Sequence, residues 1–216
     1  FDLDGTLVDS APDIAVAANK MLASEGLEPI DLATVTSFIG NGLPKLVERV
    51  MRARGIGTHH FDRLYDEMKD FYNAAPADES TPMPGVPALL EKLKADGHRL
   101  GVCTNKPEEP ARLMLKLLGL EGYFDTVVGG DSLVEKKPHP APLHLAFDRL
   151  GAGERLYVGD SEIDAEVALA ADVRFAIYSQ GYRKRAIEGL PHDFRFDHFD
   201  ALGPIVDSLP EAAPTA

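Results

Sequence analysis

From residue 86 to residue 178, short apolar runs alternate with segments whose apolar residues recur at helical spacing. Each run is short enough for one strand, and the segment between two runs is long enough for a helix. Strands connected in this way lie parallel in one sheet, with right-handed crossover helices covering both faces. The alternation therefore predicts helices over 86–95, 108–118, 142–150 and 165–171, and strands over 99–103, 125–128, 156–158 and 175–178.

Residues 11 to 75 have a different pattern, which is almost wholly helical. Three stripes of apolar residues follow one another there, and Gly and Pro residues interrupt them. A Pro-rich stretch over 74–85 predicts a linker. The opening hexapeptide adds one more strand to the sheet. We therefore expect an α/β fold, with a Rossmann-like parallel sheet in a core made of 1–11 and 83–216, and a helical domain inserted at 12–82.

The formal net charge of −13 disfavours nucleic acid and anionic membranes as partners. No apolar run is long enough to span a bilayer. The lone cysteine, Cys103, excludes a disulfide within the chain and lies in an apolar run, so we expect it in the core of a cytoplasmic protein. We also expect residues before Phe1, because a buried parallel strand needs more apolar residues, and a frayed end over 210–216.

Two aspartates lie one residue apart in the opening segment, Phe1-Asp2-Leu3-Asp4-Gly5-Thr6. Side chains of a strand alternate between its faces, so Asp2 and Asp4 share one side, and Gly5 allows a sharp turn where the strand ends. Paired carboxylates of this kind suit one nucleophile and one general acid/base, with a divalent metal reducing their repulsion. The alternative interpretation is a polar strand end followed by an ordinary Asp-Gly turn.

Polar side chains also follow three of the later strands. Ligands of open parallel sheets bind outside the carboxyl ends of the strands, so these residues should gather at one edge with Asp2 and Asp4. The four loops together carry carboxylates, a hydroxyl–amide pair and a lysine. In chain order after the first strand, the candidates are Thr104, Asn105, Lys137, Asp160 and Asp164.

An oxygen-rich metal shell can be assembled from Asp2, Asp160 and the backbone carbonyl of Asp4. Such hard ligands suit Mg²⁺, and there is no Cys/His cluster to suggest zinc. Asp160 and Asp164 are four residues apart at the start of a helix, so both can face the same point. Capping of that helix is the alternative role for Asp164.

An anion could be bound by the hydroxyl and amide groups of Thr104 and Asn105 and by the charge of Lys137. These are the groups that stabilise a phosphoryl group in its transition state. Alternatively, Thr104 and Asn105 cap the following helix, and Lys137 is a solvated surface residue. Lys137 is preferred over Lys136 because it directly precedes Pro138.

Taken together, these segments resemble the four motifs of the haloacid dehalogenase superfamily of phosphatases. The resemblance covers essentially the whole chain, and the helical insertion is similar to the small α-helical cap of that superfamily. Other segments are similar to phosphoglycolate phosphatases within it. The motifs in order are Asp2-Leu3-Asp4-Gly5-Thr6, Thr104-Asn105, Lys137-Pro138 and Gly159-Asp160-Ser161-x-x-Asp164, and the further segments are Cys103 to Glu108, Lys137 to Pro142, Gly40-Asn41-Gly42, Leu46 to Arg49 and Gly181-Tyr182-Arg183.

The resemblance implies a role for each motif residue. Asp2 would attack the phosphorus and become an aspartyl-phosphate, while Asp4 would protonate the leaving oxygen and then deprotonate the hydrolytic water. Thr104, Asn105 and Lys137 would bind the phosphoryl oxygens. The Mg²⁺ would be held by Asp2, Asp4 and Asp160, with Asp164 as a further ligand or as support.

The implied substrate is 2-phosphoglycolate, a small phosphorylated acid whose carboxylate also needs a partner. The cap segment Gly40-Asn41-Gly42 could form a backbone nest for it, or be a plain turn between helices. Lys45 and Arg49 could reach an anion from the following helix, although such residues more often form a solvated face.

Other functions fit the same motifs. A phosphatase for another small metabolite and a sugar phosphomutase are the alternatives among enzymes, and a non-catalytic binding protein on this scaffold is the alternative outside them. The sequence is compatible with a monomer or a homodimer.

Overall fold

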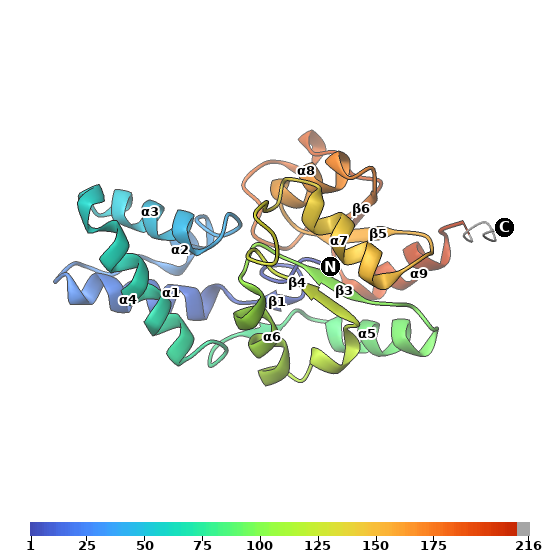
Figure 1. Ribbon diagram of the computed structural model, residues 1–216, viewed down its shortest axis with the longest axis horizontal. Helices are drawn as coiled ribbons and strands as arrows, with labels where there is room; N and C mark the ends of the chain where they lie inside the picture. Colours follow the sequence, from blue (N-terminus) through green and yellow to red (C-terminus); the bar gives the residue numbers. More distant parts are fainter. Residues whose placement is uncertain (211–216) are drawn as a thin grey trace.

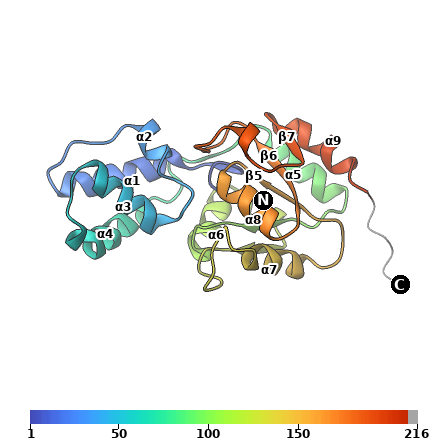
Figure 2. The same ribbon diagram turned by 90° about the horizontal axis from the view of Figure 1, so that it is seen from above.

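The computed structural model describes residues 1–210 and has two parts. Helices α1 to α4 form a small lobe, referred to below as the cap, and the remaining elements form an α/β core (Figure 1). The same separation is visible from above (Figure 2). The cap helices are α1 (Ala11–Ser24), α2 (Leu32–Thr36), α3 (Leu43–Ala53) and α4 (Phe61–Ala74).

The core alternates helices and strands, as the sequence predicted. Its helices are α5 (Val86–Ala95), α6 (Glu108–Leu117), α7 (Ala141–Leu150), α8 (Glu162–Ala170) and α9 (Leu202–Asp207). Its strands are β3 (Gly101–Cys103), β4 (Thr126–Val128), β5 (Leu156–Gly159), β6 (Arg174–Tyr178) and β7 (Phe194–Phe196). All pairings within the ladders β3–β4 and β5–β6–β7 are parallel. The α/β class with parallel sheets is therefore confirmed.

The opening segment joins the two ladders. Phe1 N donates to Gly101 O at 2.9 Å, and Cys103 N donates to Phe1 O at 2.8 Å. On the other side, Asp2 N donates to Val158 O at 2.8 Å. The opening segment is not the regular strand that we had expected, because it makes only isolated hydrogen bonds with β3 and β5. It nevertheless lies between β3 and β5, which places Asp2 in the middle of the sheet.

Alternate side chains of the strands enter two apolar clusters. Val102, Val127 and Val158 belong to the cluster that includes residues of α5, α6 and α9. Their neighbours Cys103, Val128 and Tyr157 belong to the cluster formed with α7 and α8. Both faces of the sheet are thus covered, which fixes the strands in register and leaves their ends for polar residues.

The structure differs from the prediction at three further elements. Helix α8 begins at Glu162 instead of residue 165, because Ser161 and Asp164 form a capping box that starts it earlier. Strand β7 was missed, since its short Phe194–Phe196 run follows no helix that would mark it. Helix α2 was also missed, because it has only one buried residue and no apolar stripe.

Core and cap are connected by the two-stranded pair β1 (Val8–Asp9) and β2 (Thr81–Pro82), which is antiparallel. Asp13, in the first turn of α1, supports this connection. Its buried carboxylate accepts hydrogen bonds from Glu79 N at 3.0 Å, from Ser80 N at 2.8 Å and from the Ser80 hydroxyl. The predicted division at 12–82 is compatible with this connection, although its bounds stay a prediction.

Replacement of Asp13 by Ala is expected to lower the free energy of unfolding by about 2–4 kcal/mol, because buried donors lose a charged acceptor. Urea denaturation measures this loss. The exposed Asp70 of α4 provides the matched control, and Asp70→Ala should change stability by less than about 0.5 kcal/mol. Equal stability of the two variants would contradict the role of Asp13 in the connection.

No helix within residues 1–210 has the length and apolar character needed to cross a membrane. A cavity of about 590 Å³ lies beside Phe1, Leu100, Gly101 and Leu156, at the amino ends of β3 and β5 and thus away from the site described below. The expected fraying over 210–216 falls on residues 211–216, which lie outside the described residues.

Candidate active site

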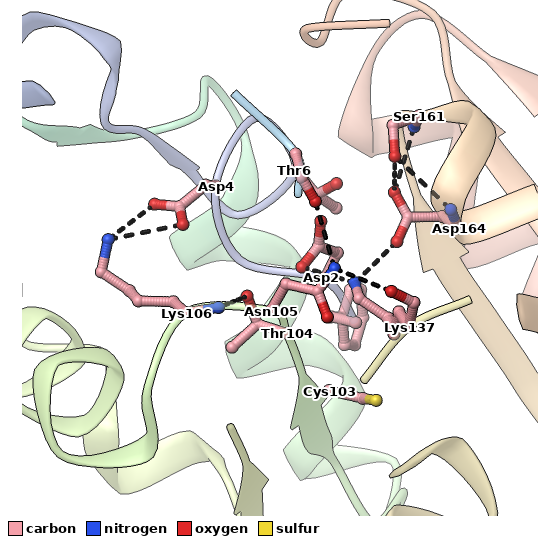
Figure 3. A network of polar contacts seen from close by, with 12 residues as sticks. Asp2, Asp4, Thr6, Cys103, Thr104, Asn105, Lys106, Lys137, Ser161 and Asp164 are labelled. Atoms are coloured by element: carbon pink, nitrogen blue, oxygen red, sulfur yellow. Dashed lines mark hydrogen bonds and ion pairs between the residues drawn. The ribbon is translucent and has the colours of Figure 1, made fainter. Parts of the chain in front are cut away.

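The polar residues that follow the strands lie together at the carboxyl edge of the sheet (Figure 3). Asp2 and Asp4 come from the opening segment. The other residues come from the loops after β3, β4 and β5, except Asp164, which lies in the first turn of α8. The expectation that these loops meet at one edge is therefore confirmed. The contacts of each side chain, described next, determine what the edge can do chemically.

Lys137 lies at the centre of this edge. Its Nζ lies 2.9 Å from Asp2 Oδ1 and 2.8 Å from Asp164 Oδ1, and donates to the Tyr157 hydroxyl at 2.8 Å. The side chain is 2% exposed, whereas the neighbouring Lys136 is exposed. Burial alone would lower the pKa of Lys137, but the Asp164 and Asp2 carboxylates raise it above its ordinary value. Lys137 is thus a buried, permanently charged ammonium.

Three buried carboxylates cluster here, and two of them, Asp2 and Asp164, pair with this ammonium. Asp2, Asp160 and Asp164 each offer an oxygen, and these atoms lie within 4.8 Å of one another. Burial and the nearby Asp164 raise the pKa of Asp2 to about 6, and burial and Asp164 raise that of Asp160 as well. Among the described residues, Asp2 Oδ1 forms no hydrogen bond, although it pairs with Lys137. The cluster lacks positive charge, and an oxygen-binding divalent cation fits it.

Asp160 is oriented from two sides. Its Oδ1 accepts from the Thr6 hydroxyl at 2.6 Å, and its Oδ2 accepts from Tyr182 N at 2.6 Å. The backbone approaches so closely there that a Cβ on Gly181 would lie 2.2 Å from the Cβ of Asp160. Only glycine fits at that position, so the loop after β6 directly supports Asp160.

Asp164 already has several partners besides Lys137. Its Oδ2 accepts from the Ser161 hydroxyl at 2.6 Å and from Ser161 N at 3.1 Å, which closes the capping box of α8. Its Oδ1 accepts from the Tyr157 hydroxyl at 3.0 Å. Burial would raise the pKa of Asp164, but Lys137 and Ser161 lower it overall. The capping role is therefore present, and a metal-ligand role for Asp164 stays a prediction.

Asp4 lies apart from the three clustered carboxylates. Its Oδ1 accepts from the Ser10 hydroxyl at 2.6 Å and pairs with Lys106 Nζ at 3.0 Å. Lys106 in turn donates to the Tyr72 hydroxyl of α4 at 2.6 Å. Sequence reasoning gave Lys106 and Tyr72 no role. The signals for Lys106 were its position directly after Thr104-Asn105 and its place in the family-like segment Cys103 to Glu108, whereas nothing in the helical pattern distinguished Tyr72.

Thr104 and Asn105 are buried next to Lys137. The Asn105 amide donates to Lys137 O at 3.0 Å and to Gly40 O of the cap at 3.2 Å. Its Oδ1 is buried and has no hydrogen-bond partner among the described residues. Thr104 Oγ1 accepts from Lys106 N at 3.3 Å, which leaves its hydroxyl proton to donate elsewhere.

The cap segment Gly40-Asn41-Gly42 lies over this edge, since its Gly40 carbonyl contacts Asn105. Asn41 Oδ1 accepts from Arg49 at 2.7 Å, so Arg49 holds the loop. Lys45 is largely exposed and pairs with Glu48 at 2.6 Å, as expected for a solvated face. A role for the three loop residues in substrate binding stays a prediction.

Tyr182 was quoted only as part of a family segment, yet it connects the site with the start of the cap. Its hydroxyl donates to Asp9 Oδ1 at 2.5 Å and accepts from Ala11 N at 3.0 Å, while its backbone N contacts Asp160. The site thus lies directly against the β1–α1 connection.

Cys103 is 1% exposed and belongs to the apolar cluster under α7 and α8. Burial raises the pKa of its thiol to about 11, so the thiol is protonated at neutral pH. Its expected position in the core is confirmed.

The raised pKa of Asp2 predicts how the stability of the metal-free protein depends on pH. The pKa is about 6 when folded against an ordinary value of 3.8, so folding disfavours the ionised form. The contribution of Asp2 to stability is present below about pH 4 and is lost as the pH rises through about 6. In EDTA, the melting temperature of wild type should therefore fall relative to that of Asp2→Asn as the pH rises. Parallel pH profiles of the two proteins would contradict this electrostatic description.

A parallel sheet with a helical cap, and buried carboxylates at its carboxyl edge, is typical of hydrolases that act on phosphate esters. The chain belongs to the haloacid dehalogenase-like hydrolase family, whose sequence model matches residues 1–178.

Curated relatives and solved structures agree with this assignment. A phosphoglycolate phosphatase of Cereibacter sphaeroides (strain ATCC 17029 / ATH 2.4.9) is 47% identical over 211 residues, which cover 97% of each chain. A phosphoglycolate phosphatase of Rhodobacter capsulatus is 40% identical over 96% of this chain and 95% of that one. The crystal structure of a predicted phosphoglycolate phosphatase from Haemophilus somnus 129PT superposes with a TM-score of 0.89 at 32% identity, covering 95% of this chain and 96% of the other.

Proposed function

We propose that this protein is a phosphatase that hydrolyses 2-phosphoglycolate to glycolate and phosphate with the help of Mg²⁺. The observation that carries the chemistry is that the buried Asp2 carboxylate pairs with Lys137 and lies within 4.8 Å of two further carboxylates, at the edge of the sheet where ligands bind. The substrate is supported by the names of relatives that are 40–47% identical over nearly the whole chain.

In the first step, an Asp2 carboxylate oxygen attacks the phosphorus, and the bond from phosphorus to the glycolate oxygen breaks. Asp4 gives its proton to that leaving oxygen, which therefore departs as the neutral hydroxyl group of glycolate. The two carboxylates have different partners, which allows them different roles. Asp2 lies among buried charged groups, while Asp4 lies farther out beside Ser10 and Lys106.

In the second step, a water oxygen attacks the phosphorus of the aspartyl-phosphate on Asp2. Asp4, now ionised, takes the proton from this water, and the bond between Asp2 and phosphorus breaks. Phosphate leaves, and both carboxylates return to their initial states. The same group therefore acts as acid and then as base.

The phosphoryl oxygens would be bound by Thr104, Asn105 and Lys137, which surround Asp2. The free hydroxyl proton of Thr104 and the charge of Lys137 are suited to stabilise the negative oxygens of the transition state. Movement of the Asn105 side chain from its contact with Gly40 O would release its amide for the same purpose.

Asp2 and Asp160, with the backbone carbonyl of Asp4, would hold the Mg²⁺, and Asp164 would support them through Lys137 and Ser161. When bound, the ion neutralises negative charge on the phosphoryl group and keeps Asp2 ionised. The lone buried cysteine and the acidic charge support a cytoplasmic location, and we expect a monomer or a homodimer.

Steady-state turnover on a panel of small phosphate esters tests this proposal, with and without Mg²⁺. The panel includes 2-phosphoglycolate, other short phosphorylated acids, ethyl phosphate and a sugar 1-phosphate. We expect the highest kcat/KM for 2-phosphoglycolate and loss of activity in EDTA. A preference for another ester would assign a different substrate, isomerisation of the sugar phosphate would indicate a mutase, and no turnover would refute the phosphatase function.

A further inference from the structure

A second buried ammonium, that of Lys106, lies beside the site and has no part in the steps above. Its Nζ is 3.0 Å from Asp4 Oδ1 and donates to the Tyr72 hydroxyl at 2.6 Å. It also lies over the Tyr72 ring, 4.6 Å from the centroid. Only 6% of its side chain is exposed. Burying an ammonium is costly unless it is paired, and here Asp4 and the Tyr72 hydroxyl are its partners.

Lys106 and Tyr72 come from the two parts of the molecule. Lys106 belongs to the loop after β3 of the core, and Tyr72 belongs to the last turn of α4 in the cap. The Tyr72 hydroxyl accepts from Lys106, and its own proton has no acceptor among residues 1–210. A compact positive charge and a free hydroxyl donor therefore lie together at the boundary between core and cap, and both suit a carboxylate.

The size of the substrate fixes where its carboxylate must lie. In 2-phosphoglycolate one methylene separates the ester oxygen from the carboxyl carbon, so a carboxylate oxygen is only about 3 Å from the ester oxygen. The proposed mechanism places the ester oxygen in hydrogen-bond contact with Asp4. The carboxylate therefore falls within a few ångströms of Asp4, which is where Lys106 lies.

Other cations near the site are engaged elsewhere. Lys137 pairs with Asp2 and Asp164. The Arg49 guanidinium donates to Phe38 O at 2.6 Å and to Asn41, and Lys184 donates to Ile39 O at 2.9 Å. Among the described residues, Lys106 is the cationic side chain that forms an ion pair with Asp4.

We propose that Lys106 and Tyr72 form the subsite that binds the carboxylate of the substrate and so select phosphorylated acids over other phosphate esters. This inference rests on the proposed phosphoglycolate activity and adds the residues that determine specificity. Because the two residues come from different lobes, the subsite is complete only when core and cap are together. The substrate carboxylate would then accept a hydrogen bond from the Tyr72 hydroxyl and pair with the Lys106 ammonium. These two groups already contact each other.

The test compares kcat/KM for 2-phosphoglycolate with kcat/KM for ethyl phosphate, which has a methyl group in place of the carboxylate. The ratio of the two is measured in wild type, Lys106→Gln and Tyr72→Phe, all with Mg²⁺. We expect Lys106→Gln to lower the ratio about 100-fold and Tyr72→Phe to lower it about tenfold. Lys116→Gln, an exposed lysine of α6, should leave the ratio unchanged.

The ratio distinguishes binding of the substrate carboxylate by Lys106 from a role in which Lys106 only positions Asp4. If Lys106 only positions Asp4, both esters lose activity in proportion and the ratio stays constant, which would overturn the inference. Thermal denaturation confirms that each variant is folded, and if Lys106→Gln does not fold, Tyr72→Phe decides alone. A wild-type protein that does not prefer 2-phosphoglycolate would refute the proposed function itself, and the inference with it.

Discussion

Replacement of Asp2 by Asn is expected to lower kcat for 2-phosphoglycolate by at least about 10⁴-fold, while the protein stays folded. The amide has the shape of the carboxylate but cannot form the aspartyl-phosphate. It also removes a charge from a cluster in which burial and Asp164 raise the pKa of Asp2. The variant should therefore melt at the same or a higher temperature than wild type in EDTA at neutral pH.

Activity and stability must be measured on the same Asp2→Asn preparation, because only a folded inactive protein assigns the loss to chemistry. Asp172→Asn, at an exposed position on the loop after α8, is a control that should retain wild-type turnover. Substantial residual turnover of Asp2→Asn at saturating Mg²⁺ would contradict the role of Asp2 as nucleophile.

Replacement of Lys137 by Met is expected to harm both stability and activity. The change leaves Asp164 and Asp2 without their buried cation, and loss of one partner of a buried ion pair costs about 3–5 kcal/mol. It also removes a positive charge next to the phosphoryl group, which should lower kcat by at least about 10²-fold. Urea denaturation and steady-state turnover measure the two effects.

The neighbouring lysine supplies the matched control for this prediction. Lys136 is exposed and directly precedes Lys137, so Lys136→Met should change the free energy of unfolding by less than about 0.5 kcal/mol and leave turnover intact. Equal behaviour of the two variants would show that the buried ion pairs of Lys137 have no energetic importance.

Much of the fold and of the candidate site could be predicted from the sequence, because both depend on local patterns. Alternating apolar runs indicate the parallel strands, and polar residues that follow a strand must lie at its carboxyl end. That reasoning brought Asp2, Thr104 and Lys137 to one edge, as Figure 3 shows, together with Asp160, whose carboxylate clusters with that of Asp2. It also favoured Lys137 over Lys136, and the buried position of Lys137 agrees.

What could not be predicted depends on contacts between distant segments. Tyr72 lies 34 positions before Lys106, and no periodicity indicates that the hydroxyl of one meets the ammonium of the other. The short β7 run and the contact of Tyr182 with Asp160 likewise arise only once the chain is folded. For Asp164 the difficulty is different. Its carboxylate both caps α8 and pairs with Lys137, and the spacing of residues in the sequence does not show that one side chain has both roles.

The most direct test of the proposed chemistry is to trap the covalent intermediate. Wild-type protein is mixed with 2-phosphoglycolate and Mg²⁺, quenched in acid during the first turnover and reduced with borohydride, which converts an aspartyl-phosphate to homoserine. Mass spectrometry then locates the modified residue. We predict homoserine at position 2 and unmodified aspartate at position 4, with no modification when the substrate is omitted. Modification at another residue, or hydrolysis with no trapped intermediate, would contradict the assignment of Asp2 as the nucleophile.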